Sequence, residues 1–169
     1  TAGIAATLQP AVAGLLMEQE IIYLSRVTEH PEPPFIAVLG GAKVSDKIPL
    51  IANLLTKVTA LVIGGGMAYT FLHVQGYPIG ASLLEQDHIA TARDILAQAA
   101  ARNVQFALPT DHVIAQSIGA DVPTRLVGSE GIPEGWMGLD IGPRSIASFQ
   151  ALLATARTVM WNGPMGVFE

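Results

Sequence analysis

The sequence has no cysteine, few charged residues and no long apolar run. Without cysteine there is no disulfide framework, no thiolate nucleophile and no cysteine-based metal site, and the cytoplasm is the expected location. Charged residues make up 14% of the chain, the net charge is −5 and no basic run occurs, so no nucleic-acid partner is expected. The longest strongly apolar stretch, residues 60–66, is too short for the roughly 18 to 20 residues that cross a bilayer, which argues against a membrane partner.

Half of the 169 residues are hydrophobic, which is enough apolar sequence for one domain with a sizeable core. Residues 11–24 repeat apolar side chains at the spacing of an amphipathic helix. Residues 30–34 contain three prolines, which remove backbone donors and disfavour helix in the preceding residue. We therefore predict an interdomain helix and proline-rich linker in residues 1–34, and an α/β domain in residues 35–169.

Both ends of the chain are expected to be cut ends. The chain begins at Thr1 without an initiator Met, and it stops at Glu169 directly after a Gly/Pro turn. An α/β domain that is incomplete at its C-terminus would leave a sheet edge uncovered, which would account for the high apolar content.

Short apolar runs without polar alternation at residues 35–39 and 60–63 predict strands buried on both faces of a parallel sheet. Further strands are expected at residues 104–108, 122–127, 138–141 and 158–161. Helices are expected at residues 45–55, with Ser45 as the N-cap, and at residues 67–75, 85–102 and 145–154. This alternation predicts an α/β fold, a Rossmann-like three-layer sandwich with a mostly parallel sheet.

Three of the loops that follow predicted strands are rich in glycine. In an open parallel sheet the ligand site lies beyond the carboxyl ends of the strands, which directs attention to these loops. Glycine lets the backbone approach a ligand closely, and the N-terminus of a following helix offers free N–H groups to an anion. The loops read Gly40-Gly41-Ala42-Lys43, Gly64-Gly65-Gly66 and Asn162-Gly163-Pro164-Met165-Gly166.

Lys43 and Lys47 lie four positions apart at the start of a predicted helix, where positive charge opposes the helix dipole. At that spacing both ammonium groups could face one side and bind phosphate oxygens. The alternative is two solvated lysines, with Gly40 and Gly41 serving only a tight turn. The spacing leaves both interpretations open, and neither a Walker A loop nor Gly-x-Gly-x-x-Gly is complete. The four histidines lie far apart, so no metal site is expected from them.

Four segments, taken together and in order, resemble the phosphoglycerate kinase family. They read GGAKVSDK at residues 40–47, GGGMAYTFL at 64–72, GWMGLDIGP at 135–143 and WNGPMGVFE at 161–169. The similarity runs through the whole chain. It implies a glycolytic enzyme that reversibly transfers a phosphoryl group between 1,3-bisphosphoglycerate and ADP, giving 3-phosphoglycerate and ATP. By this resemblance the chain is most of the nucleotide-binding, C-terminal domain.

The resemblance also implies roles for individual residues. Lys43 and Lys47 would contact the nucleotide phosphates, and Lys43 would neutralise the phosphoryl group during transfer. Asn162 and Pro164 would approach the phosphates and sugar, and Glu169 would accept hydrogen bonds from the ribose hydroxyls. The adenine slot would be lined by Gly64, Gly65, Gly66, Gly138, Leu139 and Val167.

The same resemblance places other functional groups outside this chain. The arginines and histidine for the 3-phosphoglycerate side would belong to an N-terminal domain, and the ligand for Mg²⁺ would follow Glu169. We therefore expect a monomeric enzyme that uses ATP/ADP with Mg²⁺, and we expect the isolated chain to be inactive. The alternatives are a non-catalytic α/β module that binds a nucleotide or a protein, and a nicotinamide-dependent oxidoreductase, which the missing Gly-x-Gly-x-x-Gly disfavours.

Overall fold

The computed structural model describes residue 10 and residues 12–168. The chain divides into two compact units, residues 1–31 and residues 32–169, and each is described by itself. The first unit contains helix α2, Leu15–Glu29. The predicted helix is confirmed, but it begins after Gly14, a poor helix former, and not at residue 11. No helix of the described residues is long and apolar enough to cross a membrane.

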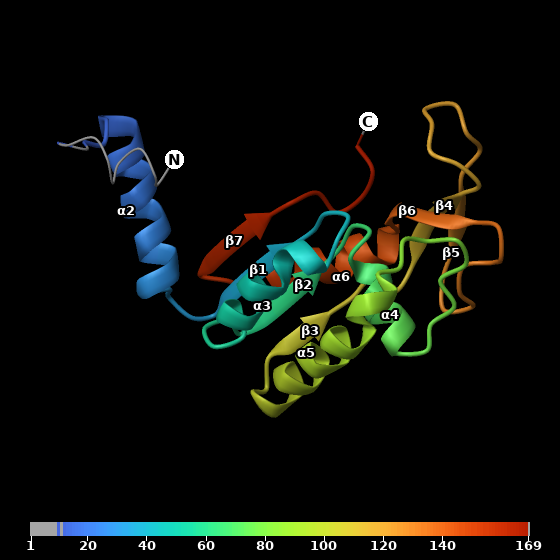
Figure 1. The fold of residues 1–169 in the computed structure, drawn as a ribbon, viewed down its shortest axis with the longest axis horizontal. Coiled ribbons are helices and arrows are strands. Elements are labelled where there is room, and N and C mark those ends of the chain that lie inside the picture. The colour runs from blue at the N-terminus through green and yellow to red at the C-terminus, as the bar shows by residue number, and fades with distance from the viewer. Residues whose placement is uncertain (1–9, 11, 169) are drawn as a thin grey trace. The chain divides into compact units, whose positions relative to one another are not determined.

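The second unit is built on a parallel sheet of four strands, in the order β3-β2-β1-β7 (Figure 1). The strands are β1 Phe35–Leu39, β2 Ala60–Ile63, β3 Gln105–Ala107 and β7 Thr158–Asn162. Every residue of β1 and β2 is buried, as their continuous apolar runs predicted. Val38 in β1 pairs with Val62 in β2 and with Trp161 in β7, so the carboxyl ends of these three strands lie at one edge of the sheet.

Helices cover both faces of this sheet. Phe149 of α6 packs against one face, where it contacts side chains that alternate along β1 and β2, Ile36, Val38, Ala60 and Val62. Figure 1 shows α3 and α5 on the other side, in front of the strands. The helices of this unit are α3 Ile48–Leu54, α4 Ala68–Val74, α5 Ile89–Ala101 and α6 Pro143–Leu153, with single 3₁₀ turns η1 Ser45–Lys47 and η2 Gln86–His88. The predicted three-layer α/β class is confirmed.

A second, antiparallel sheet was not predicted. Its order is β5-β4-β6, with β4 His112–Ala115 between β5 Arg125–Val127 and β6 Met137–Ile141. The sequence predicted strands near β5 and β6 but placed none at β4, and it grouped all strands in one mostly parallel sheet. β4 has four residues with the burial order buried, intermediate, buried, buried, so it shows neither a clean alternation nor a long apolar run.

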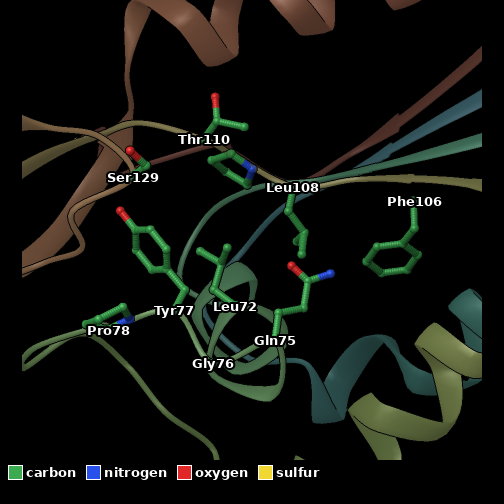
Figure 2. Close-up of a pocket in the computed structure, with 10 residues that line it drawn as sticks. Leu72, Gln75, Gly76, Tyr77, Pro78, Phe106, Leu108, Thr110 and Ser129 are labelled. Carbon is green, nitrogen blue, oxygen red and sulfur yellow. The ribbon is translucent and has the colours of Figure 1, made fainter.

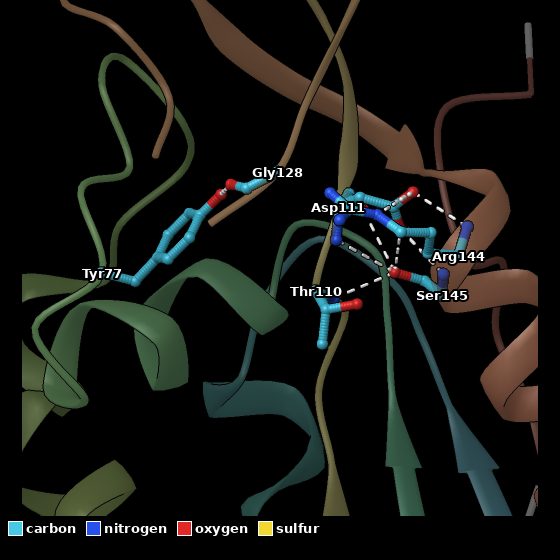
Figure 3. Close-up of polar contacts among 6 residues, drawn as sticks. All are labelled: Tyr77, Thr110, Asp111, Gly128, Arg144 and Ser145. Atoms are coloured by element: carbon cyan, nitrogen blue, oxygen red, sulfur yellow. Dashed lines mark hydrogen bonds and ion pairs between the residues drawn. The ribbon is translucent and has the colours of Figure 1, made fainter. Parts of the chain in front are cut away.

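Helix α6 is capped by a carboxylate from a distant part of the chain (Figure 3). Asp111 accepts hydrogen bonds from the backbone N–H of Arg144 at 2.9 Å, the backbone N–H of Ser145 at 2.7 Å and the Ser145 hydroxyl. Burial raises the pKa of Asp111, but the hydrogen bonds from Ser145 and Arg144, with the nearby guanidinium, outweigh it and lower the pKa overall. The loop before β4 is thereby fixed to the start of α6.

Candidate functional site

The three glycine-rich loops meet at the carboxyl edge of the parallel sheet and hydrogen-bond to one another. The N–H of Gly40 donates to the carbonyl of Asn162 at 3.0 Å, and that of Gly41 donates to Pro164 at 3.0 Å. The N–H of Gly65 donates to Met165 at 2.7 Å. Loops that are far apart in the sequence therefore form one continuous backbone surface.

Two of these glycines are required by that close approach. A Cβ on Gly40 would overlap the carbonyl of Pro164. Gly65 has φ +66°, and a Cβ there would lie 2.6 Å from the backbone nitrogen of Gly41. These glycines thus serve the packing of one loop on another, and Gly65 also lines the cavity described next.

A cavity of about 630 Å³ opens beside the three loops. Its volume falls in the usual range for a small-molecule site. No residue of its lining has an ionisable side chain. The lining includes six residues singled out in the sequence, Gly65, Gly66, Gly138, Leu139, Pro164 and Val167, and four larger apolar residues that were not, Leu83, Ile118, Met137 and Phe168. The site therefore suits an uncharged, flat or apolar group.

The other candidate residues lie outside the lining. Gly64 is buried, and a Cβ there would meet the Met165 side chain. Lys43, Lys47 and Asn162 are not part of the lining either, although Ala42 and Pro164, which are close to them in the chain, are. Glu169 lies outside the described residues.

We call residues 43–47 the lysine turn. Lys43 is exposed and Lys47 is partly buried, with its ammonium group donating to Oδ1 of Asn162. The expectation of an α-helix from residue 45 is wrong, because Ser45–Lys47 is a 3₁₀ turn and α3 begins only at Ile48. The argument that both lysines share a helix face therefore does not hold. Instead, the bond to Asn162 directs Lys47 toward the loop that follows β7.

The N-terminus of the lysine turn is occupied by the carboxylate of Glu85. Glu85 accepts hydrogen bonds from the backbone N–H groups of Val44 and Ser45, the second at 3.0 Å, and from the Ser45 hydroxyl at 2.6 Å. Ser45 does not act as the predicted N-cap through its own side chain. The expectation that these amides are free for an external anion is also wrong. The sequence gives no sign of this contact, because Glu85 lies 40 positions after Ser45.

The environment of Glu85 favours its charged form. Burial raises the pKa of this carboxyl group, but the hydrogen bonds from Ser45 and Val44, together with nearby His88, outweigh it and lower the pKa overall. Glu85 is therefore an anion at neutral pH, bonded to three donors of the lysine turn.

The described residues do not form a metal centre of their own. No group of three or more His, Asp or Glu side chains among them could hold a metal ion. Mg²⁺ in nucleotide sites takes most of its ligands from phosphates and water, with one or two protein carboxylates. We assign no magnesium ligand in this part of the chain.

A second cavity, of about 520 Å³, lies between the end of α4 and β3 (Figure 2). Leu72, Tyr77, Phe106 and Leu108 form its apolar surface, and Gln75, Thr110 and Ser129 contribute polar groups. Its lining contains none of the residues of the glycine loops, whereas the first cavity is lined by all three loops and by Ala42, which directly precedes the lysine turn. The second cavity is therefore the weaker candidate for a phosphorylated ligand.

A parallel α/β sheet with an apolar cavity and lysines at its carboxyl edge is typical of α/β enzymes that bind phosphorylated ligands. The family model described as phosphoglycerate kinase matches residues 1–169, so the chain belongs to the phosphoglycerate kinase family. It is 54% identical to the phosphoglycerate kinase of Roseiflexus sp. (strain RS-1) over 169 residues. It is 51% identical over 169 residues to a cytosolic phosphoglycerate kinase of Nicotiana tabacum.

Solved structures agree with this assignment. Phosphoglycerate kinase from Coxiella burnetii superposes with a TM-score of 0.90 at 42% identity, over 98% of this chain and 43% of that one. The enzyme from Pyrococcus horikoshii OT3 gives a TM-score of 0.79 at 27% identity, over 94% of this chain and 41% of that one. The chain also spans 42% of the length of the Roseiflexus and tobacco relatives.

Proposed function

We propose that the protein to which this chain belongs catalyses reversible phosphoryl transfer between 1,3-bisphosphoglycerate and ADP, giving 3-phosphoglycerate and ATP. Residues 35–169 are its nucleotide-binding domain, and residues 1–34 connect that domain to the rest of the protein. Family membership supports the reaction. The structural observation that carries the proposal is the lysine turn beside an apolar cavity at the carboxyl ends of β1, β2 and β7.

In this proposal the adenine ring enters the apolar cavity. Gly65, Gly66 and Gly138 line the cavity without side chains of their own, and Leu139 and Val167 provide apolar contact. The absence of ionisable side chains in the lining suits an uncharged base. Pro164, which also lines the cavity, is assigned to contact with the sugar and phosphates. Glu169 is assigned to the ribose hydroxyls on the basis of the family resemblance alone.

The phosphates then extend toward the lysine turn. Lys47, oriented by Asn162, binds phosphate oxygens as a fixed point charge. Lys43, which is exposed, neutralises the charge that spreads over the phosphoryl group during transfer. Phosphoryl transfer requires little covalent participation by the protein, so these residues contribute mainly by positioning the phosphates and by their positive charge. Phosphoglycerate kinases use ATP and ADP with Mg²⁺. A Mg²⁺ ion bound with the nucleotide would further neutralise the negative charge of the phosphates.

The 3-phosphoglycerate side is assigned to a part of the protein outside residues 1–169. We also propose a cytoplasmic monomer, which the cytosolic tobacco relative supports for the location.

Titration of MgADP into the chain, with Lys47→Ala as the variant, tests the nucleotide site. Circular dichroism first establishes that both proteins are folded. We expect the variant to bind at least about tenfold more weakly, because a hydrogen bond to a charged group is worth about 1.5 to 3 kcal/mol.

Arg93→Ala is the matched control, since it removes one positive charge from an exposed position on α5. This variant should bind MgADP as the parent does. Equal affinities for Lys47→Ala and Arg93→Ala, or no binding by a folded parent, would contradict the proposed site.

A further inference from the structure

We propose that Glu85 is a positioning residue for phosphoryl transfer, which sets the lysine turn in place relative to the nucleotide cavity. This inference rests on the proposed function, because it assigns Glu85 a role through Lys43 and Lys47. Glu85 itself is outside the cavity lining and touches the lysine turn through backbone and serine groups.

The contacts of Glu85 define the conformation of the lysine turn. One carboxylate oxygen accepts the N–H groups of Val44 and Ser45, and the other accepts the Ser45 hydroxyl. The turn is then closed by the N–H of Lys47, which donates to the Val44 carbonyl at 2.9 Å. The side chain of Val44 is 1% exposed and anchors the turn in the core. Lys43 and Lys47 therefore project from a segment whose backbone a single carboxylate holds.

Glu85 is in turn connected to the cavity. Its N–H donates to Oγ1 of Thr70 on α4 at 3.3 Å, which attaches it to a buried residue. Two positions earlier, Leu83 lines the cavity. Its side chain packs on Gly66, because a Cβ added to Gly66 would lie only 3.0 Å from Cδ2 of Leu83. The short segment from Leu83 to Glu85 thus joins the apolar side of the site to the lysine turn.

The charges favour positioning over competition with the nucleotide. Three donors already bind the Glu85 carboxylate, so much of its negative charge is compensated within the protein. The amides of Val44 and Ser45 are engaged, which leaves the lysine ammonium groups as the groups that meet the phosphates. Displacement of Glu85 by a phosphate would break all three of these bonds at once.

A double-mutant cycle in the full-length protein tests this role, with KM for MgADP and kcat as measurements. We expect Glu85→Ala to raise KM and lower kcat, each by about tenfold, because it removes the acceptor of the three hydrogen bonds that hold the lysine turn. Glu85→Gln should recover most of the loss, because its carbonyl oxygen still accepts from the backbone amides. In a Lys47→Ala background the further effect of Glu85→Ala on KM should fall below about twofold, because Lys47 is then no longer there to be positioned, whereas the effect on kcat should persist through Lys43.

Asp87→Ala is the matched control, because it removes a carboxylate from an exposed position two residues away. It should leave KM and kcat at parent values. Losses in KM that simply add in the double variant, or tighter MgADP binding by Glu85→Ala, would overturn the positioning role alone. A parent that does not bind MgADP, or is insensitive to Lys47→Ala, would overturn the proposed function and this role with it.

Discussion

His112 is a buried residue whose surroundings favour the neutral form of its side chain. It is fully buried at the start of β4, between the rings of Tyr69 and Tyr77, each with its centroid 5.4 Å away. Its Nδ1 lies 3.3 Å from the Tyr69 hydroxyl, whereas Nε2 has no hydrogen-bond partner among the described residues. Burial lowers the pKa of His112 to about 4, although neighbouring Asp111 acts in the opposite direction. His112 is therefore neutral in the folded protein at pH 7.

This predicts a loss of stability in mild acid that depends on one residue. The unfolded chain binds a proton at His112 below pH about 6.5, while the folded protein does so only near pH 4. Protonation of His112 therefore leaves the free energy of unfolding unchanged above pH 6.5 and lowers it as the pH falls toward 4, by about 3 kcal/mol in total. Urea unfolding at pH 7 and pH 4.5 should show a smaller pH dependence for His112→Phe than for the parent.

His73→Asn provides the control, since His73 is exposed on α4. Its unfolding free energy should follow the pH dependence of the parent. Parallel pH profiles for His112→Phe and the parent would contradict the role of His112.

Some residues of the site could be predicted from the sequence and others could not. Gly65, Gly66 and the lysines lie directly after apolar strands, where general rules for parallel sheets place ligand sites. Ser45 is a residue type that caps helices, but its hydroxyl instead binds Glu85. That partner comes from 40 positions away, and a local pattern contains no information about such a contact.

At the scale of elements, Glu85 and Asp111 have the same structural role, because each carboxylate accepts hydrogen bonds at the start of a helical segment. Each carboxylate comes from a loop distant in the sequence and binds the first backbone amides of a helical segment, η1 for Glu85 and α6 for Asp111. Both act at an end of a helical segment where N–H groups otherwise lack partners. Tertiary contacts therefore take part in determining where these segments begin, and α6 begins at Pro143, two residues before its predicted start at residue 145.

Removal of the α6 cap should destabilise the protein. Asp111→Ala is expected to lower the free energy of unfolding by about 1 to 2 kcal/mol at pH 7, because it leaves the N–H groups of Arg144 and Ser145 without their acceptor. The pKa of Asp111 is lowered in the folded state, so this stabilisation is present at neutral pH and declines as acid protonates the carboxylate. Urea unfolding at pH 7 measures the loss.

Asp121→Ala is a suitable comparison, since Asp121 is exposed in a loop. It should change the unfolding free energy by less than about 0.5 kcal/mol. If both variants lower the free energy of unfolding by the same amount, the hydrogen bonds of Asp111 to α6 contribute nothing to stability.

The strands differ in how far the sequence could predict them. β1 and β2 are buried on both faces, and a continuous apolar run is the direct consequence of that burial. β4 is equally buried at His112, Ile114 and Ala115, but it starts with a histidine and is held by β5 and β6 on either side. Its pairing partners are what make it a strand, and pairing between distant segments leaves little trace in a short sequence.

At the scale of the molecule, the parallel sheet assembles a site from segments more than a hundred residues apart. Gly40 bonds to Asn162, and Lys47 bonds to the same residue through its side chain. Parallel pairing of β1 with both β2 and β7 brings the three loops to one edge. This convergence follows from the α/β class, so it could be predicted. Leu83 and Ile118 of the cavity could not, because they are exposed apolar residues outside the segments that carry the family resemblance.

The described residues contain groups suited to one of the two substrates of the proposed reaction, the nucleotide, but not to the second. The larger cavity is apolar and lies beside the turn that carries two lysines, and no arginine lines either of the two cavities. A second phosphorylated substrate would require further cations, and the chain spans only 42% of the Roseiflexus relative. We therefore expect isolated residues 1–169 to bind MgADP but to show no turnover with 1,3-bisphosphoglycerate in a coupled assay.

The full-length protein should exceed the isolated chain by at least about a thousandfold in rate, because transfer requires both substrates to be held together. Its MgADP affinity, by contrast, should lie within about tenfold of that of the isolated chain if the nucleotide contacts are those of the cavity and the lysine turn. Appreciable turnover by the isolated chain would mean that the second substrate binds within residues 1–169. The smaller cavity beside Tyr77 would then be the first place to look, since its polar groups are not used by the nucleotide site.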